Sequence, residues 1–393
     1  MRNWIALLVL AAMPWPAMAA KNVSIQQLEQ ILFSGHGKSD EKVADRLSDL
    51  ALTERVSSIR LAKWEKEYPG SHTREALVKL ADEAAFLDPP EADVLRDPPP
   101  DLETQEKMLQ LAVDYVKTTI NRLPNFYATR ETTHFEDSPS QHAGYAGIPG
   151  LAAGRSDSRP LHSTGTSSVT VTYRDGREVS QAQAETSHKE DRLPTGLTTS
   201  GEFGPILGVV LGDAIESQLT WARWEQGTDD PVAVFRYAVP QTASHYRVTV
   251  PDGAKAEQFD PAYHGEIAID PATGSILWLS VVAEMAPPHE MMRTAILVEY
   301  APVAIGERTY NCPVHGVAIS RIPVSGAKER PGPAEDMWTQ LNDIAFTHYH
   351  LFGSEARIVG AGAGSGPAPS GAPDATVPSA EPGASPGTPP SPQ

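Results

Sequence analysis

Residues 264–282 read HGEIAIDPATGSILWLSVV, and this stretch determines the fold class that we expect. Ile267 and Ile269 alternate with smaller or polar neighbours, which is the period-two pattern of a strand. Residues 271–274 then provide turn chemistry, with Gly274 able to adopt a positive φ. Residues 275–282 are apolar on both faces, as in a central strand of a sheet. The stretch therefore predicts two antiparallel strands joined by a short turn.

Strand patterns recur on both sides of this hairpin. The best local hairpin signal is the Asp175-Gly176 turn between two alternating runs. Strands joined in sequence by short turns form a meander, and a meander that curls becomes a half-barrel with an apolar concave face. The further strands are predicted at residues 124–133, 167–173, 178–185, 218–225, 232–239, 245–250, 294–300, 309–322 and 342–352.

The two ends of the chain and one internal segment lack the pattern of a folded core. A basic residue, an apolar stretch and the Ala17-Met18-Ala19 motif predict a signal peptide over residues 1–19, cut after Ala19. No later segment is long and apolar enough to span a bilayer, so we expect a periplasmic or secreted protein without a transmembrane segment. Residues 136–166 predict a long exposed loop, and residues 359–393 predict a disordered tail rich in Pro, Gly, Ala and Ser.

Residues 21–123 are predicted to be helical, because apolar residues recur there at intervals of three and four. One of the short helices is predicted from Leu52, Val56 and Ile59. The strongest periodicity follows Asp101, after a run of three prolines that separates this helix from the others. We therefore expect a helical arm or small helical bundle over residues 20–100 and a sheet domain over residues 101–358.

One apolar helix is predicted inside the sheet domain. Residues 203–214 interrupt the strand pattern, with Pro205 at a position suited to the first turn of a helix. The segment is too short to span a membrane, so it is expected to cover apolar surface within the protein as a lid. The predicted fold is thus α+β, with an N-terminal helical region followed by a curved antiparallel β-sheet, an incomplete barrel with a lid helix.

Charge and cysteine content exclude several classes of function. The formal net charge is −18 and the pI is near 5.1, which argues against binding to nucleic acid or to an anionic membrane surface. Cys312 is the only cysteine, so no intramolecular disulfide forms, and its apolar neighbours predict a buried structural thiol.

No catalytic or cofactor motif stands out, and we expect no enzyme activity and no cofactor. A nucleophile elbow and a serine–histidine arrangement are both missing from the sequence. His348 and His350 would share one face of a strand and so could share a metal ion, but no third ligand has a spacing that completes the site. The sequence therefore assigns neither a catalytic residue nor a metal ligand.

Several strand and turn motifs in the second half of the chain resemble a known family. They are residues 235–240 (FRYAVP), 265–270 (GEIAID), 273–274 (TG), 298–306 (VEYAPVAIG) and 346–353 (FTHYHLFG). This set resembles the outer-membrane lipoprotein carrier (LolA-like) half-barrel superfamily over about residues 102–356. The whole chain is similar to uncharacterised exported proteins of acidobacteria. The resemblance implies an incomplete barrel that binds acyl chains or a protein partner beneath a lid helix.

Together these observations predict a non-catalytic protein that binds an apolar ligand, a lipid or the acyl chain of a lipoprotein, in the concave face of the half-barrel. The alternative is a module for interaction with an envelope protein partner or for sensing envelope stress, and a hydrolase is the third reading. The predicted ligand-binding residues combine an aromatic strand face with the lid, and they are Leu207, Leu211, Trp221, Phe235 and Trp278.

Overall fold

A computed structural model describes residues 20–137, 161–181, 202–228, 230–252, 255–285, 293–323 and 337–352. All of these belong to one compact unit, which ends at Phe352. The predicted signal peptide, the tail and most of the 136–166 loop lie outside the described residues. Among the described residues, no helix is both long enough and apolar enough to cross a membrane.

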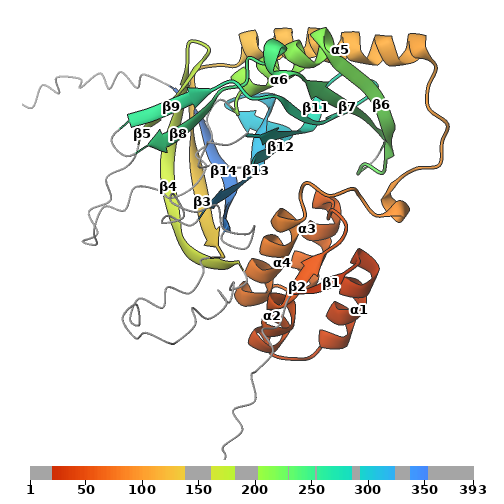
Figure 1. Ribbon diagram of the computed structural model, residues 1–393, viewed down its shortest axis with the longest axis vertical. Coiled ribbons are helices and arrows are strands. Elements are labelled where there is room, and N and C mark those ends of the chain that lie inside the picture. The colour runs from red at the N-terminus through yellow and green to blue at the C-terminus, as the bar shows by residue number, and fades with distance from the viewer. Residues whose placement is uncertain are drawn as a thin grey trace, which may run out of the picture. The chain divides into compact units, whose positions relative to one another are not determined.

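The chain is a mixed α+β protein, which confirms the predicted class (Figure 1). The helices are α1 (Ile25–Gly35), α2 (Asp40–Ser48), α3 (Ser58–Glu67), α4 (Ser71–Glu83), α5 (Leu102–Arg122) and α6 (Pro205–Glu216), with short 3-10 helices η1 (Glu91–Asp93) and η2 (Gln241–Ala243). The strands are β1 (Lys21–Val23), β2 (Leu50–Leu52), β3 (Phe126–Glu136), β4 (His162–Arg174), β5 (Arg177–Gln181), β6 (Gln218–Glu225), β7 (Val232–Val239), β8 (Val248–Asp252), β9 (Lys255–Phe259), β10 (Tyr263–Ile269), β11 (Ile276–Glu284), β12 (Arg293–Ile305), β13 (Arg308–Pro323) and β14 (Met337–Leu351).

Ten strands form one open antiparallel sheet in the order β5-β4-β3-β14-β13-β12-β11-β10-β7-β6. Strands β10 to β14 are neighbours both in sequence and in the sheet, which confirms the predicted meander. β3 pairs with β14, so the strand of this sheet that comes first in the chain lies beside the strand that comes last. The sheet is not closed, and its two edges are β5 and β6.

Two predicted segments differ from the structure. The strand expected at residues 245–250 belongs to a separate two-stranded sheet, β8–β9. The predicted loop at 136–166 is too long at its C-terminal side, because residues 162–166 already belong to β4 and pair with β3. The Asp175-Gly176 turn joins β4 and β5 as predicted.

The helix predicted from Leu52, Val56 and Ile59 is wrong. Residues 50–52 form a short parallel strand that pairs with β1, and Leu52 is buried. The next helix, α3, begins only at Ser58, and Ile59 on it is exposed. Periodicity cannot separate a buried strand from a helix over three apolar residues, so the pairing with a distant segment decided the outcome.

The N-terminal elements have a hydrophobic core of their own. Helices α1 to α4 and strands β1 and β2 contribute to it, and it is separate from the cores of the sheet. Its buried apolar side chains are Val23, Ile25, Leu28, Leu32, Val43, Leu47, Leu50, Leu52, Trp64, Tyr68, Leu77, Leu80 and Ala84. The amphipathic helices α1, α2 and α4 supply most of them, because each presents one apolar stripe to the others.

Helices α5 and α6 cover one face of the large sheet, and both lie beside it in Figure 1. Met108, Ala112 and Val116, at helical spacing on α5, are buried against the sheet, which explains the strong periodicity of this segment. Asp101 caps the helix by accepting a hydrogen bond from the Thr104 amide at 2.8 Å. The polyproline run before α5 thus marks the point where the chain passes to the sheet.

The turn between β10 and β11 packs directly against α5. Gly274 has φ +75°, and a Cβ built there would lie 2.4 Å from the carbonyl carbon of Leu111. A side chain at this position would therefore collide with helix backbone, which has no flexible end to move away. Gly176 has nearly the same φ, +77°, but nothing lies within 4 Å of its Cβ position.

We predict that Gly274→Ala destabilises the protein more than Gly176→Ala does. Both substitutions place alanine at a positive φ, which costs roughly 1–2 kcal/mol. Overlap with α5 should add about 1–3 kcal/mol at Gly274 alone. Urea unfolding followed by tryptophan fluorescence measures both free energies. Equal losses for the two variants would show that the turn does not hold α5 in place.

Candidate functional site

Helices α5 and α6 cover one face of the sheet, which we call the helix face. Four of the five predicted ligand-binding residues lie there, on α6 or on the strands that face it. Leu207 and Leu211 of α6 are 8% and 5% exposed, and Phe235 of β7 is 1% exposed. All three belong to one apolar cluster with α5 and the strands. Trp221 of β6 packs against this cluster and meets Phe235 edge to face, with ring centroids 5.3 Å apart.

The fifth residue, Trp278, faces the other side of the sheet. In the register of β10 with its neighbours, Ile267 lies opposite Phe235 and Ala268 lies opposite Trp278. Successive residues of a strand point to opposite faces, so Phe235 and Trp278 cannot share a surface. Trp278 instead lies beneath the guanidinium of Arg55, 4.4 Å from the ring centroid. The structure therefore brings four of the predicted residues together and leaves Trp278 out.

Asp213 fastens the C-terminal end of α6 to the sheet. Its side chain is almost completely buried, and its Oδ2 accepts hydrogen bonds from the Tyr263 hydroxyl and the His245 amide, both at 2.8 Å. Its Oδ1 lies 2.6 Å from Nδ1 of His245. We call this group the Asp213 latch. The hydrogen bond and the charge of Asp213 raise the pKa of His245 above its ordinary value.

A cavity lies beside the Asp213 latch. It has a volume of about 560 Å³, and Ser217, Val239, Ala262 and Tyr263 are among the residues that line it. The other residues that line it are Gln218, Ala238, Pro240 and His264, and Ser217 directly follows α6. By strand alternation, Gln218, Ala238 and His264 point to the side of the sheet opposite to Tyr263. Tyr263 belongs both to the cavity wall and to the latch, so this residue links the cavity to α6.

A second buried carboxylate lies just before α6. Glu202 is 1% exposed, and neither of its carboxylate oxygens has a hydrogen-bond partner among the residues that the structure describes. Its main-chain carbonyl accepts a hydrogen bond from the hydroxyl of Tyr300, which belongs to the apolar cluster of the helix face. A buried carboxylate without a donor is costly, so this group would gain from a ligand that donates a hydrogen bond to it.

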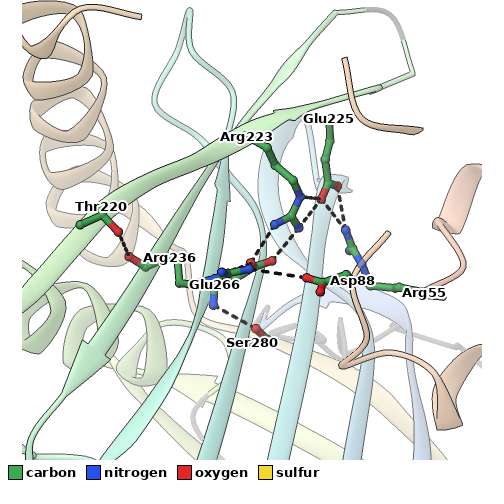
Figure 2. A network of polar contacts seen from close by, with 8 residues as sticks. All are labelled: Arg55, Asp88, Thr220, Arg223, Glu225, Arg236, Glu266 and Ser280. Atoms are coloured by element: carbon green, nitrogen blue, oxygen red, sulfur yellow. Dashed lines mark hydrogen bonds and ion pairs between the residues drawn. The ribbon is translucent and has the colours of Figure 1, made fainter. Parts of the chain in front are cut away.

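The opposite side of the sheet, which we call the junction face, carries charged side chains (Figure 2). Arg55 donates to both carboxylate oxygens of Glu225, at 2.6 and 2.8 Å, and the two side chains are 10% and 11% exposed. Arg223 donates to Glu225 and also forms a bidentate pair with Glu266, at 2.7 and 2.8 Å. Residues of the N-terminal region and of the sheet thus form one network.

The network is balanced in charge. Arg236 completes it by donating to Glu266 at 2.8 Å and lying 3.5 Å from Asp88, so three guanidinium groups face three carboxylates. Burial would raise the pKa of Glu266, but hydrogen bonds from Arg223 and Arg236 outweigh it and lower that pKa. Since each charge already has its partner, the network serves to join the N-terminal region to the sheet.

A second polar group on the junction face surrounds His315 of β13. Its Nδ1 lies 3.0 Å from Glu299 of β12, and its Nε2 lies 3.0 Å from Asp343 of β14 and 3.6 Å from Asp82 of α4. Burial would lower the pKa of His315, but these carboxylates raise it well above its ordinary value. Burial also raises the pKa of Asp82 well above the usual range. Among the described residues, Asp82, His315 and Asp343 are the group whose geometry suits a metal ion.

The other residues that the sequence singled out have ordinary surroundings. His348 has a positive φ at an irregularity in β14, which interrupts the alternation that would have aligned it with His350. His350 lies against the ring of Tyr127. Cys312 is buried as predicted, and burial raises the pKa of its thiol to about 12.

Sequence reasoning missed Asp213, Glu202 and the charged residues of the junction face. Asp213 and Glu202 flank the apolar segment that was predicted as a lid, so acidic residues at its ends were the available signal. The junction face had no such signal, because its partners come from segments far apart in the chain. No family model, no curated protein and no solved structure matches the chain.

We predict that Arg55→Ala lowers the free energy of unfolding by roughly 3 kcal/mol, since it leaves part of a buried ion pair unpaired and exposes Trp278. Arg96→Ala is the matched control, because the side chains of Arg96 and Glu91 are 92% and 91% exposed. That substitution should change stability by no more than about 0.5 kcal/mol. Urea unfolding measures both, and similar values for the two variants would mean that the network does not hold the junction.

Proposed function

We propose that the protein binds an apolar ligand, a lipid or an acyl chain, between α6 and the helix face of the sheet, without catalysing a reaction. The observation that carries this proposal is the Asp213 latch, a single buried polar residue that holds an apolar helix next to a cavity. The resemblance of the strand motifs to lipoprotein carriers is the reason for choosing lipid or acyl chain as the ligand class.

Helix α6 has the composition expected of a lid. Its inner side consists of apolar residues, with Leu207, Val210, Leu211 and Ala214 buried against the sheet and α5. Lifting the helix would expose these side chains and the facing strands, and an acyl chain would cover the same surface. The exchange of one apolar partner for another has a small net cost, because the area removed from water is similar.

The cavity beside the latch is where such a ligand would first bind. Its volume of about 560 Å³ lies within the usual range of small-molecule sites. Tyr263 lines this cavity and also donates to Asp213, so opening the latch would free Tyr263 and join the cavity to the surface beneath α6. The ligand would therefore enter at the C-terminal end of α6.

Glu202 supplies a polar group for one end of the ligand. Its two unpaired oxygens accept hydrogen bonds but cannot donate any while the carboxylate is ionised. A ligand with a hydroxyl, amide or ammonium group at its polar end would satisfy them. A carboxylate at that end would be repelled, so the proposal favours lipids with a donor group over free fatty acids.

We predict that Asp213→Asn increases binding of the neutral apolar dye 1-N-phenylnaphthylamine severalfold, because a neutral amide holds His245 and Tyr263 more weakly than a carboxylate does. Glu216→Gln, which removes an exposed charge from the same helix, should bind the dye as the wild type does. Circular dichroism checks that both variants are folded. Equal binding by Asp213→Asn and wild type would contradict the role of the latch.

Dye binding should also increase with pH. His245 has a raised pKa in the folded protein, so its ion pair with Asp213 is complete below about pH 6.5, its ordinary value, and is lost as pH rises through the folded pKa. The Asp213 latch therefore weakens as the pH rises from about 6.5 through the folded pKa of His245. His245→Gln should remove this component of the pH profile, and an unchanged profile in the variant would assign the effect to another group.

A further inference from the structure

The polar group around His315 contains more carboxyl groups than cationic partners. Asp82, Glu299 and Asp343 surround one imidazole ring. Among the described residues, no lysine or arginine forms an ion pair with any of these three carboxylates. The network around Arg55 on the same face is the internal comparison, because there three cations meet three anions.

Asp82 shows most clearly that a partner is missing. It is 1% exposed, its Oδ1 lies 3.6 Å from Nε2 of His315, and its Oδ2 is buried with no hydrogen bond to any described residue. Helix α4 places this carboxylate on the junction face, where burial removes the water that would otherwise solvate it. A buried charge with a free oxygen is costly unless a cation or a donor meets it.

The spacing of the group fits a small cation. One ligand atom each from Asp82, His315 and Asp343 can be chosen so that all lie within 4.8 Å of one another. Nε2 of His315 is 3.0 Å from Asp343 and 3.6 Å from Asp82. Ligand atoms around a tetrahedral zinc ion lie about 3.3 Å apart, given metal–ligand distances near 2.0–2.1 Å. Small movements of the carboxylates would therefore admit the ion.

Glu299 is placed to orient the ring. It lies 3.0 Å from Nδ1, the nitrogen that points away from Asp82 and Asp343. A proton shared between Nδ1 and Glu299 keeps that nitrogen protonated, so that Nε2, once it has lost its own proton, presents a lone pair to a cation between the other two carboxylates. Histidine ligands of metals commonly have such a carboxylate on their second nitrogen, which fixes the tautomer and the ring plane.

We propose that Asp82, His315 and Asp343 bind one divalent transition-metal ion, with Glu299 as a positioning residue. The ion replaces the proton on Nε2, which is released to solvent, so the exchange adds one net positive charge among the carboxylates. A ligand set with one imidazole favours ions such as zinc over magnesium or calcium, which take oxygen ligands. Because α4 contributes one ligand and β13 and β14 the others, the ion would join the N-terminal region to the sheet.

The test is a titration of the full chain, stripped with a chelator, with zinc chloride in a calorimeter. We expect one equivalent to bind and the melting temperature to rise. Asp343→Asn and Asp82→Asn should each weaken binding by about 100-fold or more and lose the zinc-dependent rise. Glu299→Gln should weaken it about 10–100-fold. Cobalt added in place of zinc should give the same visible absorption bands in Glu299→Gln as in wild type, since the direct ligands are unchanged.

The matched control is the double variant His348→Ala/His350→Ala, which removes the histidine pair that the sequence singled out and leaves Asp82, His315, Asp343 and Glu299 unchanged. It should bind zinc with wild-type affinity. Circular dichroism before metal addition separates lost binding from lost folding. No zinc binding by the folded wild type would overturn the proposal, and so would wild-type affinity in folded Asp343→Asn. Loss of binding in the histidine double variant would move the site elsewhere and overturn it equally.

Discussion

The alternation of side chains along ten strands is the constraint on which the rest of this structure depends. An open sheet exposes two faces, and here one is apolar and the other carries charged networks beside a smaller apolar cluster. The apolar face needs hydrophobic cover, because its exposure to water is unfavourable. On the charged face, the side chains that are buried need partners of opposite charge. Helices α5 and α6 meet the first need, and the N-terminal region meets the second.

The N-terminal region also covers the edge of the sheet at β6. Val94 forms an isolated antiparallel bridge with Glu225, and the Leu95 amide donates to the carbonyl of Trp224 at 3.0 Å. An uncovered edge strand invites pairing with another chain, so this contact protects the sheet as well as fixing the linker before α5. The side chain of the bridged residue, Glu225, is also the partner of Arg55. Glu225 thus takes part both in covering the edge strand, through its backbone, and in the charged network, through its side chain.

Helix α6 and the N-terminal region cover opposite faces of the sheet, and they differ in how easily another molecule could replace them. Contacts of α6 are apolar and non-directional apart from the Asp213 latch, so another apolar body can replace them. Contacts at the junction face are directional, and the central pair of Arg55 and Glu225 is almost completely buried, so loss of one partner there leaves a charge buried. This contrast is why we place ligand exchange on the helix face and a fixed metal ion at the junction face. The two proposals rest on different residues and stand independently.

The sequence by itself determined the α+β class, the strands of the meander, the Asp175-Gly176 turn, the helix near residues 203–214 and the burial of Cys312. These are local properties, since strand alternation, helical periodicity and turn residues act over a few positions. Tertiary structure decided the rest. It paired residues 50–52 with β1, it turned Trp278 away from Phe235, and it brought Asp82 to His315 and Arg55 to Glu225. Those outcomes depend on register and on contacts between distant segments, where the identity of a residue does not reveal which partner it will meet.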